Sequence, residues 1–132
     1  MSELPTVSIV TPSYNQAQFL EATMCSVLGQ DYPRIEYTIC DGGSTDGSVD
    51  IMRRHADRLA WWCSEEDKGQ ADAINKGFER SHGEILAWLN SDDLYIPGAL
   101  SFVAEYFAAY PEVDVIYGDI DRIDENGGFL SR

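Results

Sequence analysis

The sequence predicts an α/β domain whose mainly parallel sheet is flanked by helices. Short apolar runs rich in β-branched residues alternate with segments of helical periodicity, and this alternation indicates βαβ units. Three of the runs lead into polar, turn-forming residues, as strands of such sheets do before a helix. The 132 residues, with 44% hydrophobic content, suit one domain with one core and argue against disorder.

The first half of the chain predicts two strand–helix units. Val7–Thr11 is a β-rich run, and Ala17–Leu28 carries apolar residues on one helical face before Gly29, which suits a helix end. Ile35–Cys40 repeats the strand pattern. The helix expected after it spans Ser48–Ala56.

The second half continues the alternation. We expect a strand at Leu59–Cys63, a helix at Gln70–Ser81, and a buried strand at Ile85–Leu89 because that run is wholly apolar. The next helix is predicted from Pro97 to Ala109, since proline suits the first turn of a helix. Val113–Tyr117 predicts a fifth strand.

The end of the chain predicts a β-hairpin. Asp124–Gly128 contains Asn-Gly and Gly-Gly, which are strong hairpin-turn signals, and apolar residues flank it. The second hairpin strand would be Phe129–Arg132. We therefore expect the sheet to continue beyond this chain, and exposed apolar residues here to favour self-association, with a homodimer as one form.

The polar segment Asn90–Asp93 follows the apolar run at Ile85–Leu89 and is the main candidate for a metal site. Adjacent aspartates repel one another unless something offsets their charge, and Mg²⁺ or Mn²⁺ prefers such oxygen ligands. In open α/β sheets, ligands bind at the carboxyl ends of strands. The alternative is that Ser91 or Asp92 caps the next helix.

Two further strand ends carry matching chemistry. Asp41 ends a β-rich run and opens the glycine-rich segment Gly42–Ser48, where Ser44, Asp46 or Ser48 could cap a helix. Pro12–Asn15 follows the first strand. Its Tyr14 ring could stack on a nucleobase; the alternative is an ordinary surface tyrosine.

Five segments together resemble the nucleotide-binding part of family 2 glycosyltransferases with the GT-A fold. They are VSIVTPSYN at Val7–Asn15, DGGSTDG at Asp41–Gly47, NKG at Asn75–Gly77, GEILAWL at Gly83–Leu89 and NSDD at Asn90–Asp93. In this order they cover nearly the whole chain. The chain departs from the family pattern at Ile74, where many members have arginine, and at Asn90, where many members have aspartate. Asn90 is therefore not counted among the expected metal ligands.

The resemblance implies an inverting transfer of a hexose-type sugar from a nucleotide-diphospho-sugar, expected to be UDP-linked, to a hydroxyl of an acceptor glycan or lipid-linked sugar. Asp92 and Asp93 are the expected ligands of Mg²⁺ or Mn²⁺. The expected nucleotide contacts are Thr11, Pro12, Tyr14, Asp41, Lys68 and Asp92. Lys68 could equally be a solvated lysine at a helix start.

The catalytic base of such enzymes is a carboxylate that lies downstream of the paired aspartates. No segment here matches that later motif, so we expect the base beyond Arg132, with Asp119, Asp121 and Asp124 as weaker candidates. The chain would then bind nucleotide without transferring sugar. Two rival classes are a truncated, non-catalytic nucleotide-sugar-binding module and a nucleotidyltransferase. The latter would usually carry a basic N-terminal phosphate loop, whereas the first Lys or Arg here is Arg34.

Net charge limits the classes of binding partner, and cysteine content indicates the cellular compartment. The net charge of −14 argues against nucleic acid, whose phosphates require Lys and Arg, and against docking on anionic lipid by charge alone. Three widely spaced cysteines match neither a zinc site nor a disulfide framework, which favours a reducing compartment. Met1–Pro5 has no signal-peptide character. We expect a cytoplasmic protein, with a peripheral position at the inner face of the membrane as the alternative.

Overall fold

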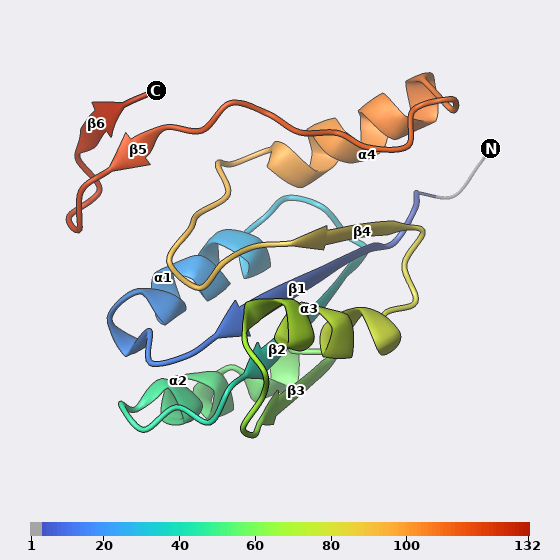
Figure 1. The fold of residues 1–132 in the computed structure, drawn as a ribbon. Coiled ribbons are helices and arrows are strands. Elements are labelled where there is room, and N and C mark those ends of the chain that lie inside the picture. The colour runs from blue at the N-terminus through green and yellow to red at the C-terminus, as the bar shows by residue number, and fades with distance from the viewer. Residues whose placement is uncertain (1–3) are drawn as a thin grey trace.

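The computed structural model describes residues 4–132, so part of the segment that we examined for a signal peptide, residues 1–3, lies outside it. The elements are β1 (Val7–Ser13), α1 (Ala17–Leu28), β2 (Ile35–Asp41), α2 (Ser48–Arg54), a 3-10 turn (Ala56–Arg58), β3 (Trp61–Ser64), α3 (Gln70–Glu79), β4 (Ile85–Trp88), α4 (Ala99–Ala109), β5 (Arg122–Ile123) and β6 (Phe129–Ser131). Four strands form a sheet in the order β3-β2-β1-β4, and all of its pairs are parallel (Figure 1). The predicted α/β class is confirmed.

Helices cover the two faces of this sheet unequally. On one face, α1, α2 and α4 contribute side chains to a large apolar cluster that also contains residues of β1 and β2; it includes Ile9, Leu20, Met24, Ile39, Met52 and Leu100. On the other face, α3 lies over β1 and β2, where Ala73 meets Val10 and Cys40 (Figure 1). β1 is central, and every one of its residues is buried.

Glycine at one position allows α3 to lie this close to the sheet. A Cβ atom on Gly77 would be 2.5 Å from Cγ1 of Val10, well inside van der Waals contact. Any larger residue would push the helix away from β1. The Asn-Lys-Gly segment therefore has a packing role at its glycine.

The prediction of a buried strand at Ile85–Leu89 is only half right. β4 forms, and Ile85 and Ala87 pack against the large cluster, but Leu86 and Trp88 are 51% and 56% exposed. Among residues 4–132, their face of the sheet carries only α3, which lies over β1 and β2. Within the described part of the chain, no strand pairs with the outer edge of β4.

The predicted fifth strand at Val113–Tyr117 is wrong. This segment is extended but unpaired, and Tyr117 is 93% exposed. Strand formation needs a neighbouring edge, and the segment runs beside α4 towards the hairpin instead of joining the sheet (Figure 1). The predicted hairpin is confirmed as the antiparallel pair β5–β6, which stands apart from the sheet.

Helix α4 also begins later than predicted. Gly98 occupies the N-cap position with φ 83°, so Pro97 precedes the helix instead of forming its first turn. The remaining boundaries differ only near the ends of elements; α2, for example, ends at Arg54 instead of Ala56.

Candidate functional site

The carboxyl ends of the four parallel strands meet at one edge of the sheet, and backbone hydrogen bonds join the loops that leave them. The Gly42 N–H donates to the Ser13 carbonyl over 2.9 Å, which ties the loop after β2 to the end of β1. The Glu65 N–H donates to the Asp41 carbonyl over 3.0 Å, which ties β3 to β2. This edge is where ligands bind in open α/β sheets.

Asp41 is the organising carboxylate of this edge. It is 1% exposed, and its Oδ2 accepts hydrogen bonds from the backbone N–H groups of Gly43 (3.1 Å) and Ser44 (2.7 Å). The Ser64 hydroxyl also donates to Oδ2 (2.8 Å), and the Ser44 hydroxyl donates to Oδ1 (2.6 Å). A carboxylate oxygen has two lone pairs, so Oδ1 retains one acceptor position.

The loop after β1 presents an aromatic ring to solvent. Tyr14 is 61% exposed, and the next residue, Asn15, adopts the left-handed conformation with φ 50°, which asparagine tolerates better than most residues. The Asn15 N–H donates to the Ser44 hydroxyl (2.8 Å), and its side-chain oxygen accepts from the Thr45 N–H (2.9 Å). The Tyr14 loop is thereby fastened to the loop after β2.

The two aspartates lie in a turn that follows β4. The Asp93 N–H donates to the Asn90 carbonyl (3.0 Å), and the Thr23 hydroxyl of α1 donates to the Asp93 carbonyl (2.8 Å). Both carboxylates are exposed. Partial burial and the charge of Asp92 raise the pKa of the Asp93 carboxyl, while a hydrogen bond from the Asn90 side chain opposes this rise.

The alternative that Ser91 or Asp92 caps the next helix is wrong. α4 begins at Ala99, and Gly98 occupies its N-cap position. Within the described part of the chain, no group of three or more His, Cys, Asp or Glu side chains is arranged to hold a metal ion. Two adjacent carboxylates still fit Mg²⁺ or Mn²⁺, which bind one or two carboxylates while phosphates and water complete the coordination. Burial is the main cause of the raised Asp93 pKa, and the repulsion from Asp92 that adds to it is what a bound cation would offset.

Three other predicted contacts lie in different surroundings. Thr11 and Pro12 are buried in β1, and the Thr11 hydroxyl hydrogen-bonds the Tyr37 hydroxyl over 2.7 Å in the core. Lys68 is exposed in the loop after β3, and its backbone N–H donates to the Asp72 carboxylate over 3.0 Å. Of these side chains, only Lys68 reaches the surface of the strand-end loops.

The candidate bases lie outside the four-stranded sheet. Asp119 is exposed in the extended segment before the hairpin. Asp121 forms an ion pair with Arg132 (2.7 Å), which holds the pKa of the Asp121 carboxyl below its usual range. The Asp124 carboxylate accepts backbone hydrogen bonds within the hairpin turn, including one from Gly128 (2.7 Å).

Sequence reasoning missed two polar side chains at this edge. Gln70, the first residue of α3, donates from Nε2 to Asn90 Oδ1 over 2.5 Å. Its place at a helix start was the available signal, because helices of βαβ units begin at the edge where strands end. Ser13 is 5% exposed, and within residues 4–132 its hydroxyl has no hydrogen-bond partner. Nothing in the sequence indicates this, because it depends on how the loops close over β1.

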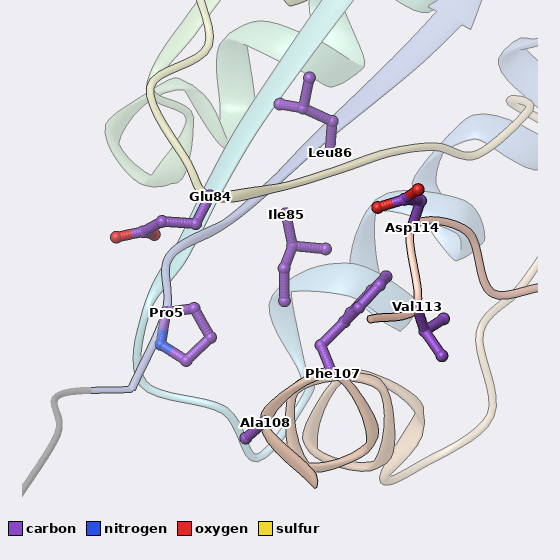
Figure 2. A pocket seen from close by; sticks show the side chains of 8 residues that line it. All are labelled: Pro5, Glu84, Ile85, Leu86, Phe107, Ala108, Val113 and Asp114. Carbon is purple, nitrogen blue, oxygen red and sulfur yellow. The ribbon is translucent and has the colours of Figure 1, made fainter. Parts of the chain in front are cut away.

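The opposite edge of the sheet holds a separate pocket of about 590 Å³. Figure 2 shows Pro5, before β1, and Glu84 and Ile85, at the start of β4, facing Phe107 of α4 and the segment that follows this helix. These are the amino ends of the parallel strands. The pocket is therefore distinct from the site at the carboxyl ends.

Comparisons with known proteins agree with the fold and show the family of the chain. The family model described as glycosyl transferase family 2 matches residues 8–132. TuaG of Bacillus subtilis strain 168, a glycosyltransferase assigned to teichuronic acid biosynthesis, is 39% identical over 113 residues, which are 80% of this chain and 45% of TuaG. The glycosyltransferase Rv1514c of Mycobacterium tuberculosis strain H37Rv is 35% identical over 93% of this chain and 48% of its own length. The chain thus spans less than half of these relatives.

Solved structures show the same architecture. The mannosyltransferase PcManGT from Pyrobaculum calidifontis, in complex with GDP-Man and Mn²⁺, superposes with a TM-score of 0.73 and 30% identity over 81% of this chain and 33% of its own. S. aureus TarS residues 1–349, in complex with UDP-GlcNAc, gives a TM-score of 0.74 at 22% identity over 80% of this chain and 32% of its own, a likeness of fold alone. The chain has the GT-A fold and belongs to glycosyltransferase family 2.

Proposed function

We propose that the protein takes part in transferring a sugar from a UDP-linked donor to a hydroxyl of an acceptor glycan or lipid-linked sugar, with inversion at the anomeric carbon. The observation that carries this proposal is the exposed pair Asp92–Asp93 at the edge where the parallel strands end. Family membership supports the reaction class. The complex of the 30% identical mannosyltransferase with GDP-Man and Mn²⁺ supports a nucleotide-sugar donor and a cation. The similarity to TuaG, which is assigned to teichuronic acid biosynthesis, supports a role in polysaccharide synthesis.

The paired aspartates would hold Mg²⁺ or Mn²⁺ between the protein and the donor diphosphate. When bound, the cation offsets the negative charge that develops on the leaving diphosphate. The protein itself is strongly acidic, with a net charge of −14, so the anionic donor is poorly attracted without a cation. Lys68 is the exposed cationic side chain in the loop after β3 that can meet a phosphate or the base.

The nucleobase would lie between the Tyr14 ring and the end of β2. The exposed ring offers a stacking surface, and the remaining lone pair of Asp41 Oδ1 can accept from a base N–H. Uracil and guanine each present a ring N–H, whereas neutral cytosine has none at the corresponding position. Because Asp41 is 1% exposed, binding requires a small shift of the Gly42–Gly43 loop.

Transfer also needs a carboxylate that removes the proton of the acceptor hydroxyl. Within the described residues, Asp119 is a better candidate than Asp121, because a lowered pKa weakens a base and Arg132 lowers that of Asp121. Substituting each by asparagine tests them. If neither change affects turnover, the base is another group.

Titration calorimetry of the protein with UDP, CDP and GDP, with Mn²⁺ and with chelator, tests the donor site. Mn²⁺ should raise UDP affinity, and Asp93→Ala should abolish this increase while Asp57→Ala, at an exposed aspartate before β3, should leave it intact. Equal UDP affinity in Mn²⁺ and chelator would reject the metal assignment. Metal-dependent binding without hydrolysis or transfer of a UDP-sugar would favour the binding-module class, and release of diphosphate from a nucleoside triphosphate would favour a nucleotidyltransferase.

Asp41→Ala should weaken UDP about tenfold or more, since a hydrogen bond to a buried charged group contributes roughly 1.5–3 kcal/mol. The change also removes the internal hydrogen bonds of the loop, so Ser44→Ala is the matched control. It loosens the same loop and keeps the carboxylate. If both variants weaken UDP equally, Asp41 acts through the loop and not on the base.

A further inference from the structure

We infer that Asp46 is a positioning residue for the nucleobase: it joins the starts of α1 and α2 and thereby fixes the loop that presents Tyr14 beside Asp41. This Tyr14 loop consists of residues 14–16, between the end of β1 and the start of α1. The inference rests on the proposed function, because it adds a residue to the same donor site. It concerns position alone, since the Asp46 carboxylate is assigned no contact with the nucleotide.

The carboxylate of Asp46 contacts the first residues of two helices. Its Oδ2 accepts a hydrogen bond from the N–H of Ala17, the first residue of α1, over 2.9 Å. Its Oδ1 accepts from the N–H (3.1 Å) and the hydroxyl (2.6 Å) of Ser48, the first residue of α2. Within the described part of the chain, the N-cap residues Gln16 and Gly47 make no side-chain capping bond. Asp46 therefore takes this role for both helices.

Electrostatics favours a negative charge at this place. The N–H groups of a first helical turn have no partners within their helix and carry partial positive charge, so a carboxylate between two such ends is stabilised by both. Hydrogen bonds, with that from the Ser48 hydroxyl as the largest cause, hold the pKa of the Asp46 carboxyl below its usual range. Asp46 is therefore ionised at neutral pH, and both of its oxygens act as acceptors.

The Tyr14 loop is consequently held at three points. At its start, Ser13 pairs with Asp41 across β1 and β2. In its middle, Asn15 hydrogen-bonds the loop after β2. At its end, Asp46 holds the first N–H group of α1. Because Tyr14 is 61% exposed, its ring is positioned mainly by this backbone.

Asp46 lies on the base side of the proposed site. β2, which ends at Asp41, and β4, which leads to Asp92 and Asp93, lie on opposite sides of β1. The loop that carries Asp46 follows β2. Fixing a contact group before binding raises affinity, because less conformational freedom is lost when the ligand binds. Loss of the Asp46 carboxylate should therefore loosen the stacking surface and leave the cation and the diphosphate in place.

Titration calorimetry with two ligands tests this division. UDP with Mn²⁺ reports on base and phosphates together, whereas inorganic pyrophosphate with Mn²⁺ lacks the base. Asp46→Ala should weaken UDP by about three- to tenfold, the size expected for one misplaced aromatic contact, and should change pyrophosphate affinity by less than about twofold. Asp50→Ala, at an exposed aspartate in the first turn of α2, makes the same change in net charge and should leave both affinities unchanged.

A double variant shows whether Asp46 acts through the aromatic ring. Asp46→Ala combined with Tyr14→Ala should weaken UDP no more than Tyr14→Ala alone, because the ring that Asp46 positions is then absent. Asp46→Asn keeps one acceptor oxygen, so its UDP affinity should lie between those of wild type and Asp46→Ala. Losses that add in the double variant would overturn the inference, and so would equal losses of UDP and pyrophosphate affinity in Asp46→Ala.

The mobility of the Tyr14 loop can be measured without a ligand. NMR relaxation gives order parameters for the backbone N–H groups of Tyr14 and Asn15, which should fall in Asp46→Ala and remain at the wild-type values in Asp50→Ala. Unchanged order parameters in Asp46→Ala would reject the inference. If wild type and Asp46→Ala bind UDP equally, the inference alone fails. A wild-type protein that binds no UDP would instead reject the proposed donor site, and with it the base contact.

Discussion

The two ends of the chain contain similar sequence patterns but differ in structure. Val7–Ser13 and Val113–Tyr117 are both β-rich runs, yet the first is a wholly buried central strand and the second is unpaired, with Tyr117 93% exposed. β1 has β2 on one side and β4 on the other, and helices lie over both of its faces. The later run has neither a pairing edge nor a covering layer within the described residues.

The difference shows that a β-rich run indicates a tendency, and neighbouring elements decide whether a strand forms. The same contrast exists between two aspartates that organise glycine-containing turns. Asp41 is buried at the end of β2 and accepts four hydrogen bonds. Asp124 accepts hydrogen bonds from the backbone N–H groups of Asn126 and Gly128, but it lies in the exposed hairpin turn.

Amide hydrogen exchange should give the largest difference. Amides of β1 should exchange only through global unfolding, and those of Val113–Tyr117 through local opening with almost no cost. For a small domain of ordinary stability, this corresponds to protection factors that differ by about a thousandfold or more. Mass spectrometry of exchanged peptides measures both segments in one sample. Equal protection would mean that Val113–Tyr117 is paired in solution, and the rejected strand prediction would be reinstated.

Removing the organising aspartates should give the next largest difference. Asp41→Ala leaves four partly buried N–H and O–H donors without their acceptor, which should lower the free energy of unfolding by about 3 kcal/mol in total. Asp124→Ala should lower it by less than about 1 kcal/mol, because water replaces the carboxylate in the exposed turn. Urea denaturation followed by circular dichroism measures both. Similar losses would show that the hairpin is an integral part of the folded core.

Adding one methyl group at two glycines should separate the regions again. The Cβ atom of Gly77→Ala would lie 2.5 Å from Val10, so α3 must shift, at a cost of about 1–3 kcal/mol. A Cβ atom on Gly118 meets no atom within 4 Å, and Gly118→Ala should change stability by less than about 0.5 kcal/mol. The same urea titration reports both values. A neutral Gly77→Ala would mean that α3 packs less closely on β1 than the structure shows.

Much of the fold followed from sequence because its signals were local. α1 spans the predicted residues, since its apolar face and the glycine at its end lie within one segment. The placement of Tyr14, Asp41 and the paired aspartates after the ends of parallel strands followed from the predicted topology. The Val113–Tyr117 error and the half-exposed β4 share another cause, because each depends on which element lies next to a strand.

The parts of the site that escaped prediction are contacts between distant side chains. Gln70 and Asn90 lie on separate elements, and only the approach of α3 to the loop after β4 brings them together. The internal bonding of Asp41 by Ser64 depends in the same way on the register of β2 with β3. Residue types predicted which side chains lie at this edge, and packing determined their hydrogen bonds.

Acid sensitivity should distinguish two carboxylates whose pKa values are both lowered, Glu36 in the sheet and Asp121 near the hairpin. Glu36 accepts from the Ser8 hydroxyl (2.6 Å) and the His82 N–H (2.8 Å), and the His82 ring lies 3.1 Å away. Burial alone would raise the pKa of Glu36, but these hydrogen bonds outweigh it and hold the pKa below its usual range. The Asp121 pKa is lowered by a hydrogen bond and ion pair with exposed Arg132.

A carboxyl group whose pKa is lower in the folded state than in the unfolded state stabilises the fold. This contribution is fully present at a pH above the unfolded-state pKa, and it is lost as the pH falls through the folded-state pKa. For Glu36 this window lies below the ordinary pKa of glutamate, about 4.3. Glu36→Gln has no such proton to bind, so its unfolding free energy should fall less steeply than that of wild type as the pH is lowered through this window. Asp121→Asn should follow the wild-type curve, because an exposed ion pair contributes little. Urea titrations at several pH values measure these slopes. If Asp121→Asn reduced the pH dependence of the unfolding free energy as much as Glu36→Gln, the Asp121–Arg132 ion pair would contribute as much to stability as the hydrogen bonds of Glu36 do.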